Sequence, residues 1–284
     1  ACAVYALGRD VGGPFAGFLA AFWLVENPDI AIWNRYILTD SLYISSVVVT
    51  LWLWHRSAAA WKLGWSLAAV AGLVWTVSIR PNGWILVPLA ALYFAFRLGG
   101  WKALLTGALP VLVLLVAAVL FFKPLQGAVQ NENPMDFLSK GIVIWDYDEW
   151  NREMPAASAG STDDWRNIID YVARYPLESI TLIASRVGIV LARVRPYYPL
   201  EMNLRIAVRY GVMYSLLALG LLWYWRHIVV KLLVAAILLH LAVVGLTVAS
   251  WDGRFLTHFF PLIALLSACG AAGMMQRLWA RRSE

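Results

Sequence analysis

The fold is decided by an apolar run near the end of the chain, VVKLLVAAILLHLAVVGLTVAS, residues 229–250. A helix needs about 20 predominantly apolar residues to cross the hydrocarbon core of a bilayer. This run has that length, and its only ionisable side chains are Lys231 and His240. It therefore predicts a membrane-spanning helix.

The composition extends this interpretation to the whole chain. Of the 284 residues, 61% are hydrophobic and 14% are charged, and the mean hydropathy is +0.67. Soluble proteins carry about 25% charged residues. The composition therefore excludes a soluble enzyme, a disordered protein and a disulfide scaffold, and it predicts an integral membrane protein. Cys2 and Cys269 lie in apolar runs, where a thiol behaves as a small hydrophobic group.

Apolar stretches bounded by polar residues predict an all-α, polytopic bundle of eight complete or nearly complete spans. The expected spans are Pro14–Val25, Tyr36–Trp54, Leu63–Ile79, Trp84–Phe96, Ala103–Phe122, Val208–Trp225, Val229–Ser250 and Phe255–Met275. They divide the chain into a first bundle (1–122), an external loop (123–204) and a second bundle with a basic tail (205–284). Residues 1–8 are too short to cross, and we expect them to end a helix that begins earlier in a longer, N-terminally truncated protein.

The basic residues of the short loops predict the orientation, because Lys and Arg favour the cytoplasmic side. Alternate loops and the tail hold ten of them, and the opposite loops hold three. The ten are Arg9, Arg56, Lys62, Arg97, Lys102, Arg226, Lys231, Arg277, Arg281 and Arg282, and the three are Arg35, Arg80 and Arg254. Both ends are therefore expected in the cytoplasm, and a reactive site is expected on the external side. The net charge of +6 reports this topology and not nucleic-acid binding.

Two helices are expected in the external loop. Ser161-Thr-Asp-Asp164 begins an amphipathic helix that Pro176 ends, and this helix is expected to lie on the membrane surface. Ile180–Val194 has the length of a short span, but Arg186 and Arg193 interrupt it. If it crossed, the later basic loops would lie outside, so the charge rule favours an interfacial or re-entrant segment.

Asp40 is the most informative acid, because it lies near the outer end of a hydrophobic helix. A carboxylate inside the membrane costs a few kcal/mol or more, which makes it a candidate for function. An Asp at a helix start is also stabilised by the helix dipole at the water boundary. Both interpretations stay open on the sequence alone.

Arginines from distant parts of the chain are expected on the same face as Asp40. Arg80 precedes a Pro-Asn-Gly turn, where it either extends its charge to water or holds a phosphate in bidentate fashion. Arg254 opens the last span, and His258 follows one helical turn later. We therefore predict that Asp40, Arg80 and Arg254 line one external pocket. The histidines have no metal-ligand spacing, so no metal site is predicted.

Several short motifs occur in a consistent order and on consistent sides of the membrane. They are Gly8-Arg9-Asp10, Arg35-x-x-x-Thr39-Asp40, Arg80-Pro81, Tyr175-Pro176-Leu177 before an Arg-containing helix, and Arg254-Phe255 followed by Pro261. In this arrangement the whole chain resembles the GT-C superfamily of membrane glycosyltransferases. The likeness is greatest to bacterial relatives of the protein O-mannosyltransferases and to the aminoarabinose–lipid A transferases.

The resemblance implies transfer of a sugar from a polyprenyl-phosphate carrier to a glycan, lipid or protein acceptor, with the active site at the outer face of a bacterial plasma membrane. It makes Asp40 a catalytic acid near the site and places Arg80 and Arg254 at the carrier phosphate. Arg35 and His258 are further candidates for substrate contact. The family's principal catalytic acid lies in the first external loop, which we expect to precede this chain. The polyprenyl-phosphate sugar is a donor substrate, and no resident cofactor is implied. The sequence does not indicate whether the reaction uses a divalent metal.

Two other classes remain as alternatives. A secondary transporter would also have many spans and buried ionisable groups, but it usually has repeated halves and broken helices near the midplane. The sequence has no internal repeat. A non-catalytic membrane scaffold would explain the apolar spans but not the gathering of Asp40, Arg80 and Arg254.

Overall fold

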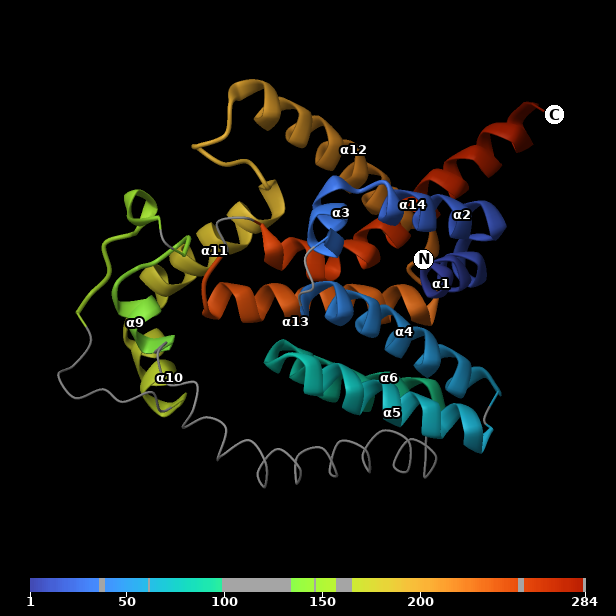
Figure 1. The fold of residues 1–284 in the computed structure, drawn as a ribbon, viewed down its shortest axis with the longest axis horizontal. Helices are drawn as coiled ribbons and strands as arrows, with labels where there is room; N and C mark the ends of the chain where they lie inside the picture. Colours follow the sequence, from blue (N-terminus) through green and yellow to red (C-terminus); the bar gives the residue numbers. More distant parts are fainter. Residues whose placement is uncertain are drawn as a thin grey trace. The chain divides into compact units, whose positions relative to one another are not determined.

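The computed structural model describes residues 1–35, 39–60, 62–98, 134–145, 147–156, 165–249 and 253–282. In these ranges the regular structure is helical, apart from two isolated β-bridges (Figure 1). The predicted all-α class is confirmed. The chain forms two compact units, 1–116 with 208–238 and 257–284, and 117–207 with 239–256. The three domains predicted in chain order stay a prediction.

The first unit begins with a series of short and medium helices. They are α1 (Cys2–Gly12), α2 (Pro14–Val25), α3 (Pro28–Arg35), α4 (Thr39–Ala60), α5 (Leu63–Ile79), the 3-10 helix η1 (Pro81–Ile85) and α6 (Leu86–Leu98). Gly13 has a φ of 89°, and Pro14 starts α2 immediately after it, so α1 and α2 form a tight hairpin. A Cβ at Gly17 would lie 2.5 Å from the carbonyl oxygen of Tyr5, and this close approach requires glycine. Figure 1 shows α4, α5 and α6 side by side.

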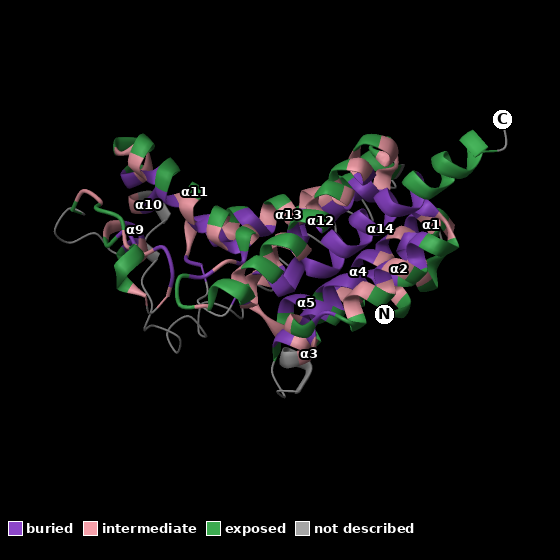
Figure 2. Cartoon of the chain, turned by 90° about the horizontal axis from the view of Figure 1, so that it is seen from above, coloured by how far each residue is buried: buried purple, intermediate pink, exposed green. Residues whose placement is uncertain are grey.

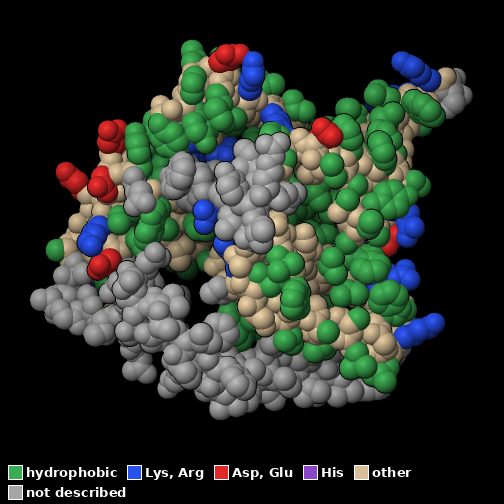
Figure 3. All heavy atoms as spheres, viewed as in Figure 1, with side chains coloured by type: hydrophobic (Ala, Val, Ile, Leu, Met, Phe, Trp, Pro, Cys, Tyr) green, Lys and Arg blue, Asp and Glu red, His purple; other side chains and the backbone are tan. Residues whose placement is uncertain are grey.

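Among the residues that the structure describes, three helices are long and apolar enough to cross a membrane, as expected of a membrane protein. They are α12 (Leu200–Tyr224), α13 (Ile228–Leu246) and α14 (Arg254–Arg282). In the most apolar stretch of α14, 94% of the residues are buried, and Figure 2 shows this stretch in the buried colour and the last turns of the helix as exposed. In the most apolar stretch of α12, only 17% of the residues are buried, and apolar side chains such as Val208 and Leu222 are exposed. Figure 3 shows hydrophobic side chains spread over the surface of the helices, as a lipid-facing surface requires.

The expected count of eight spans is not supported in the described residues. The helix α2 has 12 residues, which at 1.5 Å per residue is about 18 Å, well below the thickness of about 30 Å that a span must cover. Two more apolar helices, α5 and Asn82–Phe94, are also short. The helix α4 has 22 residues, but polar side chains including Asp40, His55 and Arg56 lower its hydropathy. Ala103–Phe122 lies outside the described residues. Apolar composition identified these segments, whereas turns at Gly13 and Pro81 limit their length.

The second unit packs α9 (Pro134–Ser139), α10 (Trp165–Arg174) and α11 (Pro176–Ala192) around a small apolar core, and the exposed 3-10 helix η3 (Asp148–Trp150) lies outside this core. The core contains Met135, Leu138, Val143, Ile144, Ile168, Tyr171 and Leu182. The helix predicted before Pro176 is confirmed as α10. It meets α11 at a bend of 105°, which makes the pair either a broken span or a re-entrant loop. The expectation that Ile180–Val194 does not cross stays a prediction.

Candidate functional site

The candidate site is built around Asp40, in the first turn of α4 in the first unit. The side chain of Asp40 is fully buried. A buried carboxylate is stable only when its charge is paired and hydrogen-bonded. Its partners come from two other parts of the chain.

Arg80 provides the first partner, between α5 and η1. Pro81 disfavours helical backbone at the preceding residue, and Arg80 is extended, with φ −148° and ψ 143°. A Cβ at Gly83 would lie 2.7 Å from the carbonyl oxygen of Thr76, so glycine lets η1 fold back over α5. From this turn Arg80 Nη2 donates to Asp40 Oδ2 at 2.8 Å, and Nε donates to Thr39 Oγ1 at 3.1 Å.

His258 on α14 provides the second partner. Its Nε2 lies 2.7 Å from Asp40 Oδ1 and 3.3 Å from Arg80 Nη1. A guanidinium can only donate, so Nε2 cannot both accept from Arg80 and donate to Asp40. The shorter distance assigns the Nε2 proton to the bond with Asp40. The ring of Tyr43 packs edge-on against His258, with centroids 5.1 Å apart.

The charges of this Asp40–Arg80–His258 network are balanced. The carboxylate and the guanidinium cancel, so the network is neutral with a neutral His258 and carries +1 after it takes up one proton. Asp40 and His258 are enclosed, while the Arg80 side chain keeps 19% of its surface exposed. The exposed side of Arg80 is therefore the edge of the network that a ligand can reach. A guanidinium beside a proton-accepting pair suits an anionic ligand whose reaction releases a proton.

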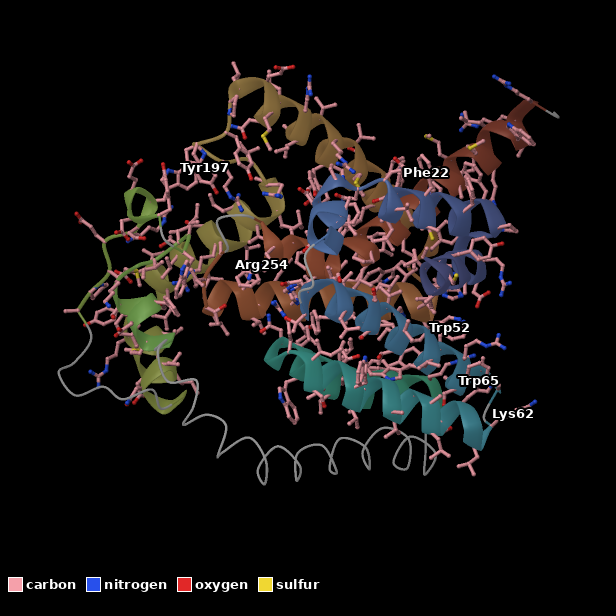
Figure 4. The ribbon with its side chains drawn as sticks, in the orientation of Figure 1. Phe22, Trp52, Lys62, Trp65, Tyr197 and Arg254 are labelled. Carbon is pink, nitrogen blue, oxygen red and sulfur yellow. The ribbon has the colours of Figure 1, made fainter. Side chains whose placement is uncertain are left out.

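The predicted site residues have different outcomes. Asp40, Arg80 and His258 are in direct contact, while their roles in substrate binding and catalysis stay predictions. Arg35 ends α3, and its side chain lies outside the described residues. Arg254 begins α14 (Figure 4) and belongs to the second unit, so its membership of the pocket stays a prediction.

Sequence reasoning named His258 as a candidate for substrate contact but did not foresee its contact with Asp40, or the contact of Arg80 with Thr39. The position of His258 one turn after Arg254 was the only available signal. It also missed the pair of Asp10 and His55, whose Oδ2 and Nε2 atoms lie 3.4 Å apart in the first unit. No group of three or more His, Cys, Asp or Glu that could hold a metal occurs in the part of the chain that the structure describes.

Arg186 of α11 has a different role from the one its sequence position indicates. It is fully buried in the second unit and donates to the carbonyl oxygens of Phe137, Ile142 and Gly245 at 2.8, 2.8 and 3.0 Å. The protein backbone therefore replaces water around this charge. The charge of Arg186 therefore does not require α11 to lie at the water interface.

Comparison of the chain with protein-family models, curated proteins and solved structures gives no match. Function therefore has to be inferred from the residues and their geometry.

Proposed function

We propose that this protein is a membrane glycosyltransferase that moves a sugar from a polyprenyl-phosphate carrier to a glycan, lipid or protein acceptor. The reaction is assigned to the extracytoplasmic face of a bacterial plasma membrane, in line with the distribution of basic residues. The observation that carries the proposal is the buried Asp40–His258 pair with Arg80 at its partly exposed edge. The motifs that resemble the GT-C superfamily support the same activity.

The proposed chemistry is a single displacement at the anomeric carbon of the sugar. The acceptor oxygen forms the new glycosidic bond, and the bond from the anomeric carbon to the phosphate oxygen breaks. The hydroxyl proton goes to the Asp40–His258 pair, which the acceptor reaches once Arg80 turns from Asp40 to the phosphate. General base catalysis of this kind contributes about 10²–10⁴-fold. No covalent enzyme intermediate is needed.

The charge balance favours this assignment. The carrier phosphate gains one negative charge as the sugar leaves, and the network gains one positive charge as it takes the proton. Opposite charges that develop together in a partly dry site stabilise the transition state more than they do in water. Arg80 is the residue expected to meet the phosphate, because its planar fork matches phosphate oxygens.

The test is transfer of labelled sugar from a polyprenyl-phosphate donor in membranes that contain equal amounts of each variant. Asp40→Asn is expected to lower turnover at least 100-fold, and Arg80→Lys is expected to weaken use of the donor about tenfold. Asp136→Asn is the control, since Asp136 is an exposed carboxylate of the second unit, paired with Lys140. Unchanged transfer in Asp40→Asn would overturn the proposal.

A proton-coupled transporter is the second candidate, because buried Asp and His side chains in helical membrane proteins also form proton relays. The Asp40–His258 pair is the observation that favours it. Uptake by proteoliposomes along a pH gradient separates the two functions. A transporter would lose uptake in Asp40→Asn and would have no transferase activity in any variant, whereas a scaffold would have neither activity in the wild type.

A further inference from the structure

The second unit contains a cavity of about 530 Å³ between the segment around η3 and one face of α11. This volume lies within the range of about 300–1,000 Å³ that is usual for small-molecule sites. None of its lining residues takes part in the Asp40–Arg80–His258 network. The cavity therefore needs an explanation of its own.

Part of the cavity lining is apolar. Gly188 and Ile189 of α11 line it, together with Trp150 at the end of η3. No atom lies within 4 Å of where a Cβ on Gly188 would be, so the helix surface is open at this point. Trp150 is 39% exposed. An exposed indole beside a bare helix surface offers a flat apolar wall to a ligand.

The polar part of the lining comes from Glu149, Asn151 and Arg152 of the segment around η3 and from Ser185 of α11. Asn151 Nδ2 donates to Asp148 Oδ1 at 2.9 Å, which fixes the orientation of the amide, because a carboxylate only accepts. Asn151 Oδ1 is then left buried without a hydrogen-bond partner in the described parts of the chain. A buried acceptor of this kind calls for a donor from a ligand or from water.

The charges of the lining residues limit the ligand. One carboxylate and one guanidinium give the cavity no net charge, so it favours neither an anion nor a cation. Tyr147 donates its hydroxyl to Glu149 Oε2 at 2.9 Å and so holds that carboxylate in place. The polar part of the lining combines acceptors on Glu149 and Asn151 with donors on Arg152, and a hydroxyl group can satisfy both kinds.

We propose that this cavity binds an uncharged sugar. A pyranose ring has an apolar C–H face, which would pack against Trp150 and Gly188, and a polar edge of hydroxyls. Those hydroxyls would donate to Asn151 Oδ1 and Glu149 and accept from Arg152. The proposal goes beyond sugar transfer by the first unit and holds whether or not that unit is a transferase.

The experiment is saturation-transfer NMR on the whole protein in an amine-oxide detergent, since sugar-headed detergents would compete. The neutral probes are methyl α-mannopyranoside, methyl α-glucopyranoside and N-acetylglucosamine, and the charged probes are glucuronate and glucosamine. At least one neutral probe is expected to receive saturation, and its binding is expected to weaken at least tenfold in Gly188→Leu. The Cβ of a leucine at 188 meets no other atom, its longer side chain occupies the cavity, and leucine favours the helix more than glycine does.

The matched control is Gly211→Leu on α12, another helical glycine with nothing within 4 Å of its Cβ position. It adds the same side chain outside the cavity and is expected to bind sugar as the wild type does. Equal unfolding temperatures for the two variants would show that both are folded. The proposal is overturned if no neutral probe binds, if only charged probes bind, or if Gly188→Leu binds as well as Gly211→Leu.

Discussion

Arg80 in the first unit and Arg186 in the second are held in opposite ways. Side chains from α4 and α14 surround Arg80, and its main partner is the carboxylate of Asp40. Backbone carbonyls surround Arg186, which donates to three of them and is fully buried. Arg80 keeps 19% of its side chain exposed.

The difference in partners indicates a chemical role for Arg80 and a structural role for Arg186. A carboxylate partner can take up a proton, and a ligand anion can compete for its guanidinium. Backbone carbonyls can do neither, since they do not titrate and cannot move away without unfolding the surrounding segments. Arg80 is therefore suited to a reaction and Arg186 to holding α11 against its neighbours.

The largest effect is expected from Asp40→Ala, which removes the counter-ion of Arg80 and the partner of His258. Breaking a buried ion pair by removing one member costs about 3–5 kcal/mol of unfolding free energy. Unfolding of the purified protein in mixed micelles measures it, with Asp136→Ala as the exposed control. A loss no larger than that of the control would mean that the network does not stabilise the first unit.

Arg186→Lys is expected to have the next largest effect, because a lysine ammonium cannot reproduce the positions of three guanidinium donors. Losing one charge-assisted hydrogen bond costs about 1.5–3 kcal/mol. The same unfolding measurement applies, and Arg205→Lys, at an exposed position of α12, is expected to change nothing. In Arg186→Lys, sugar transfer per folded molecule should equal that of the wild type. In Arg80→Lys, transfer per folded molecule should be lower. The reverse pattern would contradict the assignment of the two roles.

Gly270→Ala tests the packing of α14, the helix that carries His258. A Cβ at Gly270 would lie 1.9 Å from the carbonyl oxygen of Leu216 on α12, so the two helices would have to separate. Overpacking of this kind costs about 1–3 kcal/mol. Gly211→Ala, which meets no neighbour, is expected to stabilise the protein by about 0.5–1 kcal/mol. Equal stabilities of the two variants would show that close approach at Gly270 is not required.

The smallest effect is expected from pH, through His227 between α12 and α13. Burial lowers the pKa of His227, Arg97 lowers it further, and Asp10 opposes them. A lowered pKa means that the unfolded state binds the proton first, so stability is lost as the pH falls below about 6.5. Unfolding temperatures measured between pH 7.5 and pH 5.5 should fall, and His227→Gln should reduce the fall. The same slope in the variant would assign the effect to other groups.

Part of the architecture could be read from the sequence because it depends on local properties. The apolar runs that became α12, α13 and α14 were identified, as was the helix that ends before Pro176. Their boundaries were less accurate: α12 begins at Leu200 and not at Val208. The first turns of α12 are mostly exposed and contain the polar residues Glu201, Asn203 and Arg205, so a search for apolar runs misses the start of this helix.

The candidate site could be predicted only as a set of charges expected on one face. Arg80 was singled out because it lies at a turn on that expected face, where it could hold a phosphate. Asp40 was singled out because an ionisable group in apolar surroundings is costly and needs a reason. The same criterion marked Arg186 as an interruption of an apolar run and could not distinguish its role from that of Arg80. Both are arginines beside apolar residues, and only their partners differ.

Local sequence was sufficient for the helical class, the membrane character and the turn at Arg80-Pro81-Asn82-Gly83, because hydrophobicity and backbone restrictions act over a few residues. Tertiary structure was needed for the pairing of Asp40 with His258, which are 218 residues apart in the chain. It also decided that three carbonyls hold Arg186 and that Gly188 faces open space. The partner of a buried charge is set by whichever distant segment packs against it, and packing depends on the shape of the whole fold.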